Sequence, residues 1–231
     1  MKALPSGKLL VSGYLRNQIV LYRLTANGRR DPSFGGGDGK VTVGSGKGEN
    51  GYGPIPAPFA VERGGRIILA GADFTGSILN GESVVLVRLL ADGRRDPTFR
   101  RTIFIERAPI DADEPIPRKH VEYYAFDPQG LAVDAKGRIV IVGSELAPYV
   151  RGQKEPGYQF FAARRFLPNG RRDQTFGEGG VFPTNPPGSK GYAHAAVTAG
   201  DGQVVAGGWI QLERGGGISR GNTAMLLTRY R

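Results

Sequence analysis

Cysteine is absent from the 231 residues of this sequence, which excludes disulfide bonds and thiolate-bound metals. Histidine occurs only at His120 and His194, which leaves few candidates for acid–base catalysis. No stretch approaches the roughly 18 consecutive apolar residues of a membrane-spanning helix. The opening MKALPSGKLLVSG lacks the apolar length of a signal peptide, so we expect neither a membrane span nor a signal peptide in this chain.

The sequence also lacks the short motifs that identify common enzyme classes. It contains no G-x-S-x-G, no H-E-x-x-H, no P-loop and no dinucleotide-binding fingerprint. The glycine-rich GGGDGK that begins at Gly35 opens no predicted helix, so we do not assign it to phosphate binding. His194 lies in a predicted strand, where we expect a packed histidine and not a catalytic base. We therefore predict no catalytic residue and no cofactor.

Basic residues outnumber acidic ones, 31 to 21, which gives a net charge of +10. Such a charge attracts nucleic acids, anionic lipids or acidic glycans over long range. Because the charge is spread along the chain, we interpret it as a solvated surface and do not expect a nucleic-acid partner. Glycine is abundant, at 37 residues, without a collagen period. This composition indicates many tight turns, as in all-β proteins.

One motif occurs three times. Glycine, two arginines and aspartate are followed by a variable residue, by serine or threonine, and by phenylalanine; we call this the GRRD motif. It occupies residues 28–34, 93–99 and 170–176. The spacing between copies varies while the surrounding pieces stay the same, which indicates connecting loops of different length.

Short apolar runs recur in a fixed order around the motif. A glycine-bounded run occurs four times, as GKLLVSG, GRIILAG, GRIVIVG and GQVVAGG. A strand-like piece precedes three of these runs and is the predicted first strand of the unit, with the glycine-bounded run as the second. The predicted third strand follows each run, as IVLYRL, VVLVRL, FFAARRF and MLLTRY. The runs lack a polar face, which suits strands packed on both sides. A fourth strand is predicted over residues 172–177 (RDQTFG).

Four antiparallel strands per unit, repeated along a chain, are typical of a β-propeller blade. We predict a single all-β domain of about four four-stranded blades, over residues 1–57, 58–128, 129–191 and 192–231. Asparagine or aspartate before each motif glycine indicates a two-residue type I′ turn between the third and fourth strands. A β-sandwich is the alternative, but it would not repeat its sequence.

The combined pattern LAVDAKGRIVIVG…FFAARRFLPNGRRDQTFGEGGV resembles the bacterial delta-60 repeat family and, more distantly, propeller repeats of the NHL type. The resemblance covers almost the whole chain. It implies a β-propeller and, because such repeats often belong to longer exported proteins, a secreted or cell-surface location in bacteria. The chain departs from the family in its paired arginines and in having fewer units than a full ring usually needs.

The first and last units are expected to be incomplete. MKALPSGK aligns with the first-strand piece FAVERGGR, and AMLLTRYR at the end is a third strand. Exposed strand edges of this kind are normally covered. We therefore expect an open arc, completed by another copy or by the rest of a longer propeller, and not a self-closed four-bladed ring.

Long connections are expected on one edge of the blades and short turns on the other. Long loops on a rigid scaffold commonly bind ligands, so we place the ligand site on the long-loop edge. The predicted ligand-binding residues are His120, Tyr123, Tyr124, Tyr149, Tyr158 and Trp209. The acid-rich DADE at residues 111–114 lacks the glycine and the spacing of an EF-hand loop, so we expect no metal.

The short-turn edge provides a second candidate, an anion-binding site formed by the paired arginines. These are Arg29, Arg30, Arg94, Arg95, Arg171 and Arg172. An aspartate directly follows each pair, and we expect each pair to be solvated or to be neutralised by nearby acids, of which Asp31, Asp96 and Asp173 are the candidates. On that interpretation the arginines are surface residues and do not form a shared anion site.

Two further sets of residues recur with a structural meaning. An arginine stands inside each third-strand run and needs a carboxylate partner, for which the motif aspartate is the candidate. These arginines are Arg23, Arg88, Arg165 and Arg229. The motif phenylalanines are expected to be buried at the ends of the fourth strands. They are Phe34, Phe99 and Phe176.

Three classes of function fit these patterns. The first is a non-catalytic binding or scaffold module of a bacterial surface or exported protein. The second is a propeller enzyme of the lyase or glycosidase type, acting on a carbohydrate in the central channel or on the long-loop edge. Acids that converge with either histidine in a deep pocket would favour it. The third is a polyanion binder that uses the paired arginines, and acids mixed among them count against it.

Overall fold

The computed structural model describes residues 1–15, 18–43, 57–73, 83–100, 102–105, 125–146, 159–177, 179–184, 189–212 and 223–231. Strands dominate these residues, and the one helical element among them is a short 3-10 turn, η1 (Arg63–Gly65). Within the described ranges, no helix has the length and apolar character needed to cross a membrane. The fold is all-β, as the sequence predicts.

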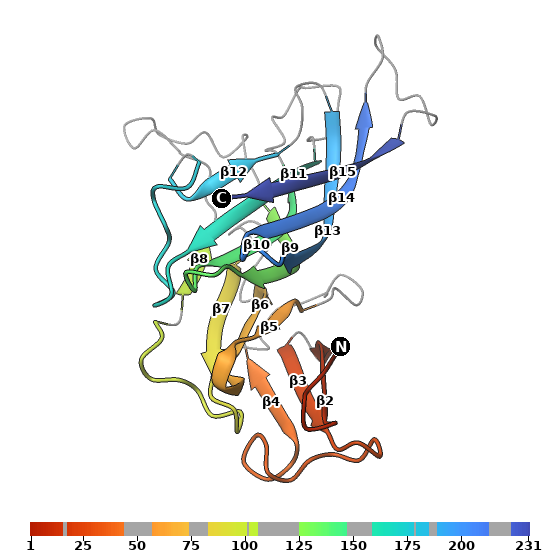
Figure 1. The fold of residues 1–231 in the computed structure, drawn as a ribbon, viewed down its shortest axis with the longest axis vertical. Coiled ribbons are helices and arrows are strands. Elements are labelled where there is room, and N and C mark those ends of the chain that lie inside the picture. Colours follow the sequence, from red (N-terminus) through yellow and green to blue (C-terminus); the bar gives the residue numbers. More distant parts are fainter. Residues whose placement is uncertain are drawn as a thin grey trace, which may run out of the picture.

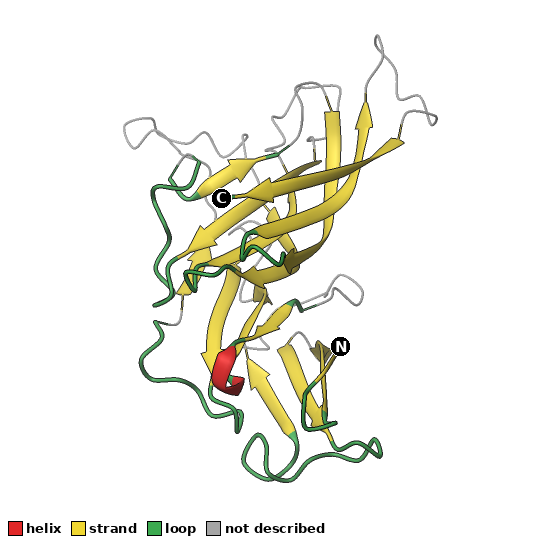
Figure 2. Ribbon diagram, viewed as in Figure 1, coloured by secondary structure: helices red, strands yellow, loops and turns green. Residues whose placement is uncertain are grey.

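The strands form four antiparallel sheets in chain order (Figures 1 and 2). The first sheet contains β1 (Lys2–Ala3), β2 (Leu9–Leu15), β3 (Gln18–Leu24) and β4 (Lys40–Val43). The second contains β5 (Phe59–Val61), β6 (Ile67–Asp73), β7 (Ser83–Leu89) and β8 (Thr102–Ile105). The third contains β9 (Ala125–Val133), β10 (Ile139–Leu146), β11 (Gln159–Phe166) and β12 (Val181–Pro183). The last contains β13 (Ser189–Thr198), β14 (Val204–Leu212) and β15 (Thr223–Tyr230).

Within each sheet, strands that follow one another in the chain are hydrogen-bonded neighbours. Each sheet is therefore an up-and-down meander, the architecture of a propeller blade. The predicted first, second and third strands are confirmed in every unit. The first sheet begins with a strand of only two residues, and the last sheet has three strands in the described part of the chain. The predicted incompleteness of the first unit is thus limited to its short first strand, and the last unit lacks a fourth strand among the described residues.

The four sheets follow one another along the long axis of the molecule (Figure 1). The first sheet lies at one end of this axis and the last sheet at the other, so the sheets form an open arc and not a closed ring. This arrangement agrees with the predicted open arc, and its completion by another copy or by a longer propeller stays a prediction.

The fourth strand predicted over residues 172–177 is wrong. These residues form one isolated bridge and a series of turns, and β12 begins only at Val181. The reason is local hydrogen bonding: Asp173 accepts a bond from the backbone N–H of Thr175, a pairing that replaces the bonds of a sheet ladder. The first two motifs add a proline, Pro32 or Pro97, which cannot donate to a ladder at all.

The predicted type I′ turns are also wrong. The N–H of Gly28 donates to the carbonyl oxygen of Thr25 at 2.9 Å, and the N–H of Thr25 donates to that of Arg29 at 2.8 Å. Gly28 has a φ of 80° and is the last of three loop residues. This is a three-residue hairpin loop with a bulged glycine, in which only the glycine needs positive φ. The same hydrogen bonds recur at the equivalent glycines, Gly93 and Gly170.

Apolar side chains fill the spaces between successive sheets. In β6, Ile67 packs toward the first sheet with Leu21, whereas the next residue, Ile68, packs toward the third sheet with Ile141. A third cluster joins the third sheet to the last. The middle sheets are thus buried on both faces, which explains why their strands lack a polar face.

Candidate functional site

The third strand of each complete sheet carries an arginine that joins its sheet to the next. Arg88 in β7 donates from Nε to Oδ2 of Asp96 at 2.8 Å and from Nη2 to Oγ1 of Thr98 at 3.2 Å. Its Nη1 donates to the carbonyl oxygen of Pro168, in a turn of the third sheet, at 3.0 Å. We call this set of contacts the arginine latch.

The latch recurs in the first and third sheets. Nε of Arg23 lies 2.6 Å from Oδ2 of Asp31, and Nε of Arg165 lies 2.8 Å from Oδ2 of Asp173. In both cases Nη1 donates to a backbone carbonyl oxygen of the following sheet. The prediction that the motif aspartate is the partner of the strand arginine is confirmed for all three complete sheets.

Each latch arginine also lies over the ring of the motif phenylalanine. The guanidinium carbon is 4.5, 4.8 and 4.4 Å from the ring centroids in the first, second and third sheets, within the range of a cation–π contact. Phe34, Phe99 and Phe176 are 0%, 4% and 5% exposed, so their predicted burial is confirmed. Their predicted place is corrected: they precede the fourth strands and do not end them.

The motif aspartates are buried anions with lowered pKa values. A hydrogen bond from the Lys8 ammonium is the largest cause that holds the pKa of Asp31 far below its ordinary value. For Asp96, the hydrogen bond from the Thr98 hydroxyl is the largest cause, and the pKa falls to about 2. Burial alone would raise the pKa of Asp173, but hydrogen bonds from a threonine hydroxyl and the latch arginine outweigh burial and lower it. The aspartate of the motif therefore serves the junction between sheets.

The motif glycine is required by close contact between sheets as well as by its positive φ. A Cβ added at Gly93 would lie 2.8 Å from the ring of Phe34 in the preceding sheet. One added at Gly170 would lie 2.7 Å from the ring of Phe99. Each copy of the motif thus contacts the next copy, and the three motifs line up along one edge of the arc.

The paired arginines lie on this edge. The loops that carry them run along the lower and left-hand side of the view in Figure 2. Arg29, Arg30, Arg94, Arg95 and Arg171 are exposed, and Arg172 is half-buried. Successive positively charged segments therefore share one edge of the molecule.

Of the two expectations for these pairs, neutralisation by the motif aspartates is wrong, because the latch arginines bind those aspartates, whereas exposure to solvent is confirmed for all but Arg172. Arg94 pairs instead with Asp92, at 2.7 Å, and Arg30 lies over the Tyr22 ring, 5.2 Å from its centroid. In the part of the chain that the structure describes, no carboxylate forms an ion pair with the remaining exposed members, Arg29, Arg95 and Arg171. The edge is more strongly positive than the sequence pattern suggests.

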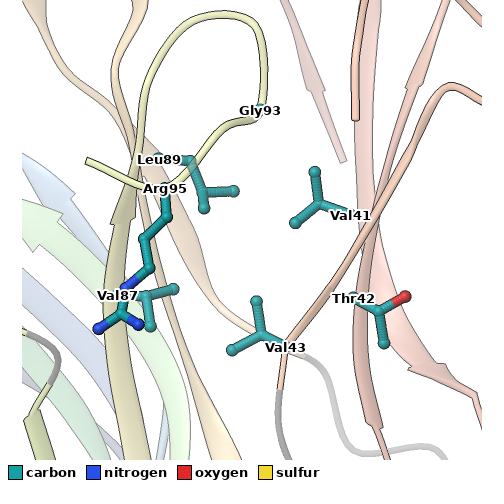
Figure 3. Close-up of a pocket in the computed structure, with 7 residues that line it drawn as sticks. All are labelled: Val41, Thr42, Val43, Val87, Leu89, Gly93 and Arg95. Carbon is teal, nitrogen blue, oxygen red and sulfur yellow. The ribbon is translucent and has the colours of Figure 1, made fainter. Parts of the chain in front are cut away.

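A cavity of about 270 Å³ lies between the first and second sheets, next to the second motif (Figure 3). It is lined by Val41, Thr42, Val43, Val87, Leu89, Gly93 and Arg95. Figure 3 shows the two valines of β4 facing Val87 and Leu89 of β7 across the cavity, with the Arg95 side chain along one side. Apolar walls and a single cation suit an amphipathic anion. The lining provides no pair of groups for acid–base catalysis.

Most of the predicted ligand-binding residues lie outside the described residues: His120, Tyr123, Tyr124, Tyr149 and Tyr158. The acidic stretch at residues 111–114 lies outside them too. Trp209, in β14, is half-buried and stacks on Tyr192 of β13, with ring centroids 4.4 Å apart. It belongs to an aromatic pair on the last sheet.

Two titratable groups bear on the enzyme hypothesis. His194 in β13 is exposed, so the expected packed position is wrong. Asp127 in β9 was not found by sequence reasoning; burial raises its pKa, and its Oδ2 accepts a hydrogen bond from Gln129 at 2.5 Å. Among the described residues, no group of three or more histidine, aspartate and glutamate side chains has the arrangement of a metal site.

Comparison with known proteins agrees with this architecture. The model of a β-propeller domain of unknown function, DUF5122, matches residues 4–34 and 65–99. Each matched stretch ends at the phenylalanine of a GRRD motif. A comparison with curated proteins finds no match to the chain. The fold and the family model together define the chain as a β-propeller repeat domain.

Proposed function

We propose that this chain is a non-catalytic binding and scaffold module of a bacterial surface or exported protein built from delta-60 repeats. The arginine latch carries the proposal: the most strongly repeated polar residues of the sequence bind one another within each unit, and the arginine also donates to a backbone carbonyl oxygen of the next sheet. Repetition is thus explained by assembly of a rigid scaffold, with no need for catalysis. Fold alone does not imply function, so the ligand must be identified by the surfaces that the scaffold presents.

The long-loop edge is the proposed ligand-binding surface, and bacterial polysaccharides are the first ligand class to test. The immobilised chain is exposed to neutral and acidic polysaccharides, and bound mass and new reducing ends are measured in parallel. We expect binding without cleavage. New reducing ends or unsaturated sugar products would contradict the proposal and favour the lyase or glycosidase alternative.

A polyanion-binding function at the paired arginines is a second candidate. It is favoured by one observation: the motif aspartates are bound to the latch arginines, which leaves Arg29, Arg95 and Arg171 without a described ion pair. Exposed guanidinium groups along one edge fit the sulfate or phosphate groups of an extended polymer.

Heparin retention tests this second candidate. Replacement of Arg29, Arg95 and Arg171 by glutamine is expected to lower the salt concentration at which the chain leaves a heparin column. The matched control removes the same charge from exposed residues outside the motifs, by Lys2→Gln, Arg63→Gln and Lys136→Gln. Equal elution of the two variants would show that net charge alone determines retention, because counterion release depends on the number of phosphate-like contacts.

A further inference from the structure

The last sheet has the third sheet against one face and an outward face that is rich in exposed apolar side chains. Met225 and Leu227 of β15 are 78% and 66% exposed, and Val197 of β13 is 59% exposed. Between these strands lies β14, whose Trp209 is paired in register with Met225. Large side chains on three adjacent strands thus form an apolar surface of the kind that marks an interaction site.

The positions equivalent to Leu227 and Met225 are buried in the three other sheets. They lie two and four residues before the latch arginine: Leu21 and Ile19, Leu86 and Val84, and Ala163 and Phe161. Each of these side chains is 0% or 1% exposed, because the next sheet covers it. Leu227 and Met225 stand two and four residues before Arg229. The outward face therefore has the composition of a junction between sheets.

The first sheet presents the complementary half of such a junction on its outer face. A Cβ added at Gly71 would lie 2.5 Å from Cδ1 of Ile19, and one added at Gly93 would lie 2.8 Å from the phenylalanine of the preceding sheet. At the equivalent positions of the first sheet, Gly13 and Gly28, an added Cβ would have no described atom within 4 Å. The close-contact glycines are present there, but no preceding sheet touches them.

We propose that the outward face of the last sheet binds the outer face of the first sheet of a second copy, head to tail. The internal junctions are the argument for this occupant: both surfaces repeat, position by position, the two halves of junctions that the chain already forms. Such a heterologous contact joins copies into a closed ring or an open series. Two chains would then continue one propeller arc across the boundary between them.

The contact lacks one component of the internal junctions. Arg229 forms an exposed ion pair with Asp201, at 3.2 Å, and not a buried latch. Exposed pairs contribute little to binding. The apolar face must therefore supply most of the affinity, and we expect reversible assembly that depends on protein concentration.

Light scattering of the 231-residue chain across a range of concentrations tests assembly. We expect the mean mass to rise with concentration, and Leu227→Asp to keep the chain monomeric, since a carboxylate cannot be buried there without a partner. Because Leu227 is exposed in the single chain, this variant should keep the unfolding temperature of the parent. The control is Lys136→Gln, which lowers the net charge by the same one unit on an exposed turn of the third sheet and should assemble like the parent. A parent that stays monomeric at all concentrations would overturn the proposal.

Thiol cross-linking tests the orientation. Met225 occupies the position of Ile19, and Gly13 that of Gly71, so the internal contact predicts that Met225 of one copy meets Gly13 of the other. The chain has no cysteine, so Gly13→Cys and Met225→Cys each introduce one reactive thiol. A short bismaleimide should join the two variants only when they are mixed. Efficient cross-linking of Met225→Cys alone would show that two last sheets meet face to face, and would overturn the head-to-tail contact.

Discussion

At the scale of single residues, the latch shows how a buried charge pair is stabilised. Arg88 and Asp96 are 7% and 4% exposed, so both have lost most of their hydration. Burial of charges is favourable only when additional hydrogen bonds satisfy the remaining donors and acceptors. Thr98 supplies these bonds to both partners, since its hydroxyl accepts from Arg88 and donates to Asp96.

Asp96→Asn is expected to destabilise the protein by about 3 kcal/mol, because it leaves a buried guanidinium without its anion. The other carboxylate near Arg88, that of Glu62, is 3.9 Å away and too far to replace the hydrogen bonds. The matched control is Asp92→Asn, which breaks an exposed pair and should cost about 0–1 kcal/mol. Urea unfolding measures both variants. Equal losses would show that the latch is no stronger than a surface pair.

The same residue predicts a dependence of stability on pH. The pKa of Asp96 is lowered from 3.8 to about 2 in the folded chain. A lowered pKa adds stability above the ordinary value and loses it as the pH falls through the folded value, here between about 3.8 and 2. The loss amounts to about 2 kcal/mol for this group. Urea midpoints at neutral and acidic pH should therefore fall less steeply for Asp96→Asn than for the parent chain; parallel curves would contradict the assignment.

Residues also differ in how well the sequence predicts their roles. The pairing of strand arginine and motif aspartate was predictable, because both recur at the same separation in three repeats and an arginine among apolar residues needs an anion. Asp127 gave no such signal, since it does not recur in the repeats and its raised pKa depends on its burial in the folded chain. The environment of an acid that does not recur is visible only in three dimensions.

At the scale of elements, the motif turns connect conformation with packing. Gly28 and Gly170 have φ values of 80° and 85°, so alanine is strained equally at both. Only Gly170 touches the preceding sheet, where an added Cβ would lie 2.7 Å from the Arg100 carbonyl oxygen and from the Phe99 ring. The two glycines therefore separate backbone strain from the packing between sheets.

Gly28→Ala should cost about 1–2 kcal/mol, the penalty of a left-handed conformation with a side chain. Gly170→Ala should cost at least 1 kcal/mol more, because the added methyl also forces two sheets apart. Thermal unfolding of the two variants, at a concentration where the chain is monomeric, provides the comparison. Equal losses of stability in the two variants would mean that the sheets can move apart at this turn without a measurable energetic penalty.

Elements were predictable where their side chains decide the structure. The first three strands of each unit are apolar runs between glycines, and the structure contains them at those places. The fourth strand was misplaced because Asp, Ser or Thr, and Phe resemble an alternating strand, while their side chains in fact bind the backbone and the latch. A middle strand is apolar on both faces, and the sequence of one repeat does not show which face packs against the preceding sheet and which against the following one. That assignment depends on the order of the sheets in the fold.

At the scale of the whole molecule, stability arises between adjacent sheets. Each apolar cluster joins one sheet to the next, and the latches cross the same junctions. In such a linear array every unit depends on its nearest neighbours, so the end units have fewer stabilising contacts than the middle ones. The last sheet has fewer stabilising contacts than the middle sheets, since its outward face is exposed in the single chain.

Hydrogen exchange should reveal this gradient. Backbone amides of β10, in a sheet covered on both faces, are expected to exchange more slowly than those of β14, whose sheet is covered on one face, because local opening of an end unit breaks only one junction. Mass spectrometry of peptic peptides measures both strands in one sample at low protein concentration. Addition of more chain should then slow exchange in β14 and β15 while leaving β10 unchanged, if a second copy covers the outward face. Uniform exchange through all four sheets would show instead that the arc opens as one cooperative unit, and that its junctions are too strong for the ends to separate alone.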